Sequence, residues 1–99
     1  MSAKKAAPGS PALTKDFTVS NKLGIHARPA ALLVKTASRF SCEIFVEKDG
    51  EKVNGKSIMG LMMLAAGPGS RLTVHAHGHD ASQALEEIGA LIQRKFGEE

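Results

Sequence analysis

Apolar and polar residues alternate in several short segments of the chain, a pattern typical of half-buried strands. We expect strands at residues 17–20, 42–47, 51–53 and 72–77. The Asp49-Gly50 pair between the second and third segments favours a tight turn, so these two strands should form a hairpin. The pattern therefore predicts four strands.

Between the strands, apolar residues recur every three or four positions, as on one face of an amphipathic helix. The first helix is expected to begin at about Ala27, with His26 at the N-cap position. Pro29 then lies in the first turn, where a missing N–H has no structural cost. A second helix should run from Ile58 to about Ala66 and end at a Gly-Pro-Gly turn.

A third helix is expected after Asp80, which together with Gln83 resembles a capping box. The resulting order, β-α-β-β-α-β-α, predicts an α+β fold. It would be a two-layer, open-faced sandwich with a four-stranded antiparallel sheet and three helices on one face. Residues 1–14 are rich in small residues, proline and lysine and are expected to form a flexible leader. Residues 15–99 would then form one domain.

Composition narrows the class of protein. A chain of 99 residues can bury only one modest core, which excludes a large enzyme with a deep internal pocket. Residues 17–71 contain eight basic and four acidic side chains, whereas residues 72–99 contain two and five, so an acidic partner or an anion is expected at the central segment. The single cysteine, the lack of an apolar run of signal-peptide length and the lack of a membrane-length apolar stretch favour a soluble, cytoplasmic protein.

The segment Gly24-Ile25-His26-Ala27-Arg28-Pro29-Ala30 is the first candidate site. It places an imidazole at a helix start, where unpaired backbone N–H groups and the helix dipole favour an anion. Arg28 adds a planar charged group suited to phosphate oxygens. His26 could therefore accept a phosphoryl group; the simpler alternative is an ordinary N-cap histidine beside a solvated arginine.

The segment from Ser57 to Ala66 is the second candidate, because it is apolar nearly all round. A short helix in a two-layer domain buries one face, here Leu61 and Leu64. We expect the rest to form an exposed, methionine-rich patch suited to binding partners, consisting of Ile58, Met59, Met62 and Met63. The alternative is that the whole helix belongs to the core.

These two segments, their spacing and the element order resemble HPr, the histidine-containing phosphocarrier family of the bacterial phosphoenolpyruvate-dependent phosphotransferase system. The resemblance covers roughly residues 17–96 and rests on G-I-H-A-R-P-A and K-S-I-M-G-L. It implies that His26 takes a phosphoryl group on Nδ1 from enzyme I and passes it to enzyme IIA proteins or domains in sugar transport. Arg28 would stabilise that group, and Ala27 would supply a backbone N–H. Such a carrier is not itself an enzyme and needs no cofactor.

The resemblance also implies regulation and docking. Ser57 matches a serine that an ATP-dependent kinase, the HPr kinase/phosphorylase, phosphorylates in many relatives; a plain helix cap is the alternative. The methionine-rich patch would contact both partners. Part of a basic rim for acidic partners would come from Lys35, Arg39 and Lys56. The chain is expected to act as a monomer.

Other interpretations remain open. One is the nitrogen-branch paralogue of the same family; another is a small α+β interaction module without phosphoryl transfer. Few aromatic residues argue against RNA binding, and we find no paired carboxylates near His26 and no phosphate-binding glycine loop of an enzyme. His75, His77 and His79 are interpreted as a solvated strand face rather than a metal site. Cys42 is expected to be a small buried residue.

Overall fold

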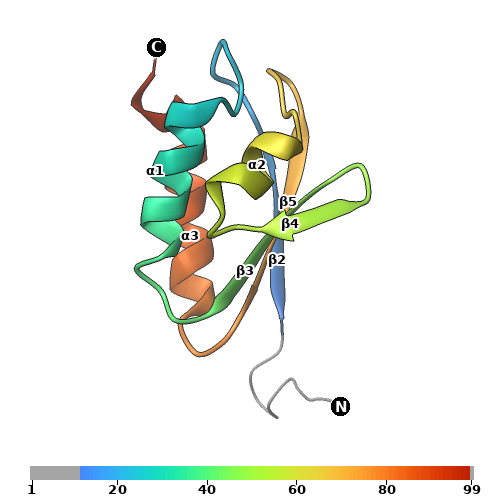
Figure 1. Ribbon diagram of the computed structural model, residues 1–99. Coiled ribbons are helices and arrows are strands. Elements are labelled where there is room, and N and C mark those ends of the chain that lie inside the picture. The colour runs from blue at the N-terminus through green and yellow to red at the C-terminus, as the bar shows by residue number, and fades with distance from the viewer. Residues whose placement is uncertain (1–11, 99) are drawn as a thin grey trace.

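The computed structural model describes residues 12–98. Four strands, three helices and one short 3-10 turn follow each other along the chain (Figure 1). They are β2 (Leu13–Thr18), α1 (Ala27–Ala37), β3 (Glu43–Lys48), β4 (Glu51–Asn54), α2 (Ile58–Met63), β5 (Arg71–His77), α3 (Ala81–Gln93) and η1 (Lys95–Gly97). This confirms the expected β-α-β-β-α-β-α order, to which the structure adds η1.

The strands form one antiparallel sheet in the order β2-β5-β3-β4. Strand β5 therefore lies inside the sheet, where its register pairs Val74 with Val46 on one side and Lys15 on the other. The tight turn is present, with Asp49 at φ 51° and Gly50 at φ 85°. Both residues thus adopt the left-handed conformation that two-residue hairpins require.

The three helices lie on one side of the sheet, which confirms the open-faced α+β sandwich (Figure 1). On β5, Leu72, Val74 and Ala76 are buried under the helices, while the intervening residues face the open side and are half-buried. Helices α1 and α3 contribute the other half of the core through Leu33 and Ile88, which are fully buried. The buried side chains, at every second position of the strands and every third or fourth position of the helices, thus pack together in one apolar layer.

The first strand lies earlier in the chain than expected. Strand β2 begins at Leu13 and ends at Thr18, instead of spanning 17–20, so Leu13 and Thr14 belong to the sheet rather than to the leader. Its first four residues are all exposed, because β2 is an edge strand held by its backbone pairing with β5. Val19 is buried, but it lies beyond the strand. Residues 1–11 of the expected leader lie outside the described residues.

One expected helix end and one expected capping contact are wrong, while the start of α3 directly after Asp80 is confirmed. Helix α2 stops at Met63 rather than near Ala66, because its last turn tightens and Ala65 adopts φ 52°. Asp80 is the N-cap residue of α3, but its side chain forms no capping bond. Its carboxylate instead accepts the N–H groups of Ser41 at 2.9 Å and Cys42 at 3.0 Å, which ties the loop after α1 to the start of α3.

Within residues 12–98, no helix is long and apolar enough to cross a membrane.

Candidate functional site

His26 is the N-cap residue of α1, as expected, in extended conformation and without a capping bond from its side chain. Its carbonyl accepts the first helical bond from Ala30 N at 3.0 Å. Pro29 has no N–H, so the amides of Ala27 and Arg28 are the two first-turn donors without an intrahelical partner. No acidic residue lies in the first turn. This helix end therefore presents two N–H groups and the positive end of the helix dipole beside an imidazole.

The loop before His26 is fixed by close packing against the segment that follows α2. Ile25 N donates to Ala66 O at 2.8 Å, and His26 N donates to Gly24 O at 3.1 Å. Gly24 has φ 70°, and a Cβ there would lie 2.3 Å from Ala66 O. Only glycine fits this conformation and this distance without a shift of backbone. The glycine at the start of the motif thus positions the histidine.

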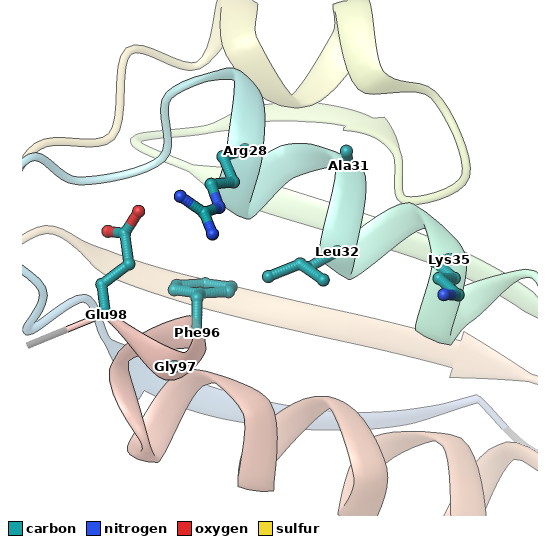
Figure 2. A pocket seen from close by; sticks show the side chains of 7 residues that line it. All are labelled: Arg28, Ala31, Leu32, Lys35, Phe96, Gly97 and Glu98. Atoms are coloured by element: carbon teal, nitrogen blue, oxygen red, sulfur yellow. The ribbon is translucent and has the colours of Figure 1, made fainter.

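Arg28 leaves α1 beside a pocket of about 480 Å³ that lies between α1 and the C-terminal turn. Figure 2 shows its guanidinium extended over the ring of Phe96, at the same end of the pocket as the Glu98 carboxylate. Lys35 lies at the far end, beyond Leu32. Arg28 is exposed, and within residues 12–98 no carboxylate lies within ion-pair distance of it. Its charge is therefore available to an incoming anion.

Glu98 was missed from the sequence, although it contacts the candidate histidine directly. Its Oε2 lies 3.0 Å from His26 Nε2, and the two side chains are 23% and 36% exposed. Its Oε1 accepts a hydrogen bond from Asn21 Nδ2 at 2.9 Å. Asn21 is fully buried and also donates to Gly24 O at 2.8 Å. A single carboxylate, rather than a carboxylate pair, thus completes the site from 72 positions away.

Helix α2 carries the second candidate site. Leu61 and Leu64 are buried, as expected, while the four residues of the methionine-rich patch are exposed: Ile58 by 42%, Met59 by 72%, Met62 by 43% and Met63 by 67%. Leu23, in the loop before His26, is also 72% exposed and was not singled out in the sequence. The exposure fits a docking surface, and the docking role itself stays a prediction.

Ser57 is the N-cap residue of α2, and its Oγ accepts the N–H of Gly60 at 3.0 Å. The capping alternative is therefore present in the structure. The side chain is partly exposed. A cap and a modification site are compatible at a helix start, because the helix dipole also stabilises an added phosphate.

The three expected rim cations differ in their surroundings. Lys35 lines the pocket beside α1. Lys56 donates its ammonium to the carbonyl of Phe40 at 2.8 Å, so part of its hydrogen-bonding capacity is used inside the fold. Arg39 is 61% exposed and lies 3.8 Å from Glu87. Of the three, only Lys35 lines the same pocket as Arg28, at the opposite end of that pocket.

The remaining candidates lie elsewhere. His75 Nε2 is 2.7 Å from Glu47 Oε1 on the open side of the sheet, and His77 is half-buried on the same strand. Among residues 12–98, no three His, Cys, Asp or Glu side chains are grouped closely enough to hold a metal ion. Cys42 is 2% exposed, which confirms its burial. Burial raises the pKa of the Cys42 thiol to about 11, and the nearby Asp80 carboxylate adds to the rise.

Comparison with known proteins identifies a family and several relatives that this chain matches. Residues 13–94 match the family described as "PTS HPr component phosphorylation site". The chain is 53% identical over 81 residues to HPr-like protein Crh of Halalkalibacterium halodurans, with 82% of this chain and 96% of the relative covered. It is 45% identical over 86 residues to phosphocarrier protein HPr of Cupriavidus necator, with 87% and 97% covered.

Solved structures of HPr and Crh proteins share the fold of this chain. HPr-C-His from Thermoanaerobacter tengcongensis superposes with a TM-score of 0.85 at 49% identity, covering 88% of this chain and 98% of that one. Crh of Bacillus subtilis, described as a catabolite repression protein and a swapped dimer, gives a TM-score of 0.69 at 51% identity, covering 80% and 91%.

Proposed function

Because the chain belongs to the HPr family of phosphocarrier proteins, we propose that it relays a phosphoryl group through His26 in sugar phosphotransferase transport. The group arrives from enzyme I and leaves to enzyme IIA proteins or domains. The chain acts in the cytoplasm as a covalent carrier rather than as an enzyme, and needs no cofactor. Its partners recognise a folded surface, with no nucleic acid and no membrane insertion involved.

The observation that carries this proposal is the position of His26 at the N-cap of α1, directly before its first turn. The unpaired amides of Ala27 and Arg28 can donate to phosphoryl oxygens, and the Arg28 guanidinium can pair with the charge. A helix dipole contributes only about 0.3–2 kcal/mol to a bound anion. Such a site tunes the energy of a phosphohistidine without trapping it, which is what a relay requires.

The test is the intact mass of the chain after incubation with phosphoenolpyruvate and enzyme I. We expect one added phosphoryl group that is labile in acid and stable in base, as for a phosphohistidine. His26→Ala should accept none. His79→Ala is the matched control, since it removes an exposed imidazole outside the site and should be phosphorylated as the unaltered chain is.

If the chain gains no mass with an active enzyme I, the proposal that it serves sugar transport is contradicted. The same incubation with the donor of the nitrogen branch then decides between the two branches. Modification of His26→Ala would place the phosphoryl group on another residue and refute the role of His26.

We further propose that phosphorylation of Ser57 by an HPr kinase/phosphorylase slows phosphorylation of His26. A phosphate would add about −1.5 to −2 charges to α2, the helix that carries the methionine-rich patch. Ser57→Asp should therefore be phosphorylated more slowly by enzyme I. Ser57→Ala loses the bond to Gly60 N, at a cost of about 1 kcal/mol, but adds no charge and should keep the rate. Equal rates for all three chains would contradict this regulation.

We propose that partners dock on the methionine-rich patch, whose exposed side chains on α2 supply flexible apolar contacts. Lys35, Arg39 and Lys56 would supply the positive charge of the rim. Association with acidic partners at such a surface should weaken as salt is raised, because exposed charges are screened.

A regulatory role is the second candidate, favoured by the 53% identity to a protein named HPr-like protein Crh and by the likeness to Crh of Bacillus subtilis, described as a catabolite repression protein. It is supported if Ser57 is phosphorylated by the kinase while His26 accepts no group from either donor. We propose that the carrier acts as a monomer. The Crh structure described as a dimer makes light scattering the direct check.

A further inference from the structure

The C-terminal turn is built so that Glu98 reaches the candidate histidine. Lys95, Phe96 and Gly97 all have positive φ values, 59°, 57° and 74°. Two of them are not glycine, and this conformation is uncommon for residues with a Cβ. Phe96 is only 3% exposed and anchors the turn in the core. The chain therefore folds back toward α1 at the end of α3 (Figure 1), and Glu98 lies at the same pocket as Arg28 of the first turn of α1 (Figure 2).

The carboxylate is held from the opposite side by a buried amide. Asn21 Nδ2 donates to Glu98 Oε1 at 2.9 Å and to Gly24 O at 2.8 Å. Both partners are acceptors, so the nitrogen end of the amide must face them. Asn21 Oδ1 is buried and has no hydrogen-bond partner among the described residues. The fold thus accepts one unpaired buried oxygen, which is costly, while both donors of this amide are used.

This arrangement decides which ring nitrogen of His26 carries a proton. A carboxylate only accepts hydrogen bonds, so a neutral imidazole in contact with it at 3.0 Å must donate from Nε2. The proton then lies on Nε2, and Nδ1 keeps its lone pair. The same logic applies wherever a carboxylate orients a histidine and fixes its tautomer.

We propose that Glu98, held by Asn21, is a positioning residue that keeps the neutral ring of His26 in the Nε2–H tautomer and so makes Nδ1 the nucleophile. This inference rests on the proposed phosphoryl relay. In the transfer, the Nδ1 lone pair forms the new N–P bond. The N–P bond of the donor, a phosphohistidine protonated on its other ring nitrogen, breaks, and its electron pair returns to that ring. The Nε2 proton stays in place, and Glu98 faces the positive charge that develops on the His26 ring.

Glu98→Gln tests the inference, because a neutral amide can either accept from Nε2–H or donate to an unprotonated Nε2. The tautomer is measured from the ring 15N chemical shifts of His26 in the unphosphorylated, full-length chain at a pH where the ring is neutral. We expect Nε2–H in the unaltered chain and a measurable fraction of Nδ1–H in the variant. Glu86→Gln is the matched control, since it removes the same charge from an exposed position on α3.

The second readout is the rate of phosphorylation by enzyme I with the chain as the varied substrate. Glu98→Gln should lower kcat by about ten-fold, the difference expected between a charged and a neutral hydrogen-bond acceptor, and leave KM near that of the control. An unchanged tautomer, or a change in KM alone, overturns the positioning role while the relay through His26 stands. If the unaltered chain accepts no phosphoryl group, the proposed function falls and the inference falls with it.

Discussion

Replacing Gly24 by alanine should damage the fold and the site together, because the new methyl group would press on the loop after α2. A Cβ at Gly24 would lie 2.3 Å from Ala66 O and 2.7 Å from Gly67 Cα, both of them backbone atoms. Ala66 O cannot retreat freely, since it accepts the N–H of Ile25 at 2.8 Å. Relief of the clash therefore requires the loss of this bond and a shift of the loop that carries His26.

Two costs add up in this variant. A non-glycine residue in the left-handed region costs roughly 1 kcal/mol, and loss of a buried backbone hydrogen bond costs about another 1–2 kcal/mol. We therefore expect Gly24→Ala to lower the free energy of unfolding by about 2–3 kcal/mol. Gly50→Ala isolates the first cost. Gly50 has φ 85°, but a Cβ at this position would meet no other atom within 4 Å, so the loss of stability should be about 1 kcal/mol.

Urea unfolding of the two variants and the unaltered chain at 25 °C measures these losses. Phosphorylation by enzyme I should be slow in Gly24→Ala and unchanged in Gly50→Ala, because only the former displaces His26. Equal stability losses in the two variants would refute the reasoning, since the contact with Ala66 would then carry no constraint. Normal phosphorylation of Gly24→Ala would show that the position of this loop does not affect phosphoryl transfer to His26.

Three further predictions concern the rest of the fold. Hydrogen bonds, first from the N–H of Ser41, lower the pKa of Asp80. In urea unfolding, the unaltered chain should therefore be more stable than Asp80→Asn at about pH 6, and this difference should disappear as the pH falls below about 4. Met59→Lys should change the unfolding free energy by less than about 0.5 kcal/mol but weaken binding to enzyme I; unchanged affinity would argue against docking there. Cys42, with its raised pKa and 2% exposure, should react with a thiol reagent only on unfolding, and fast native labelling would contradict its burial.

Local patterns were enough for the elements whose apolar residues lie over the core. The helix start at Ala27 and the strand at 72–77 are confirmed because buried and exposed positions alternate there with the period of the element. The first strand was expected at 17–20, four residues too late, because its early residues do not lie over the core. Residues 13–16 are all exposed at the sheet edge, so the pairing that makes them a strand leaves no trace in the hydrophobic pattern.

Contacts between distant segments were beyond the sequence. Glu98 belongs to a polar tail without periodicity, and nothing near it indicates that it contacts His26. The apparent pairing of Asp80 with Gln83 had a local rationale, yet two amides across the fold, those of Ser41 and Cys42, take the carboxylate instead. Local propensity describes one segment at a time, whereas these side chains have partners that only the tertiary fold supplies.

The hydrogen bond between Asn21 and Glu98 joins positions 77 residues apart. A contact of such sequence separation is entropically expensive to close before the intervening chain is ordered. Only the packed sheet and helices bring the two residues together, so this bond depends on the whole of the intervening fold. A substitution that loosens the packing far from His26 should therefore also loosen the hold on the carboxylate that faces it. The site would then open although none of its own residues is changed.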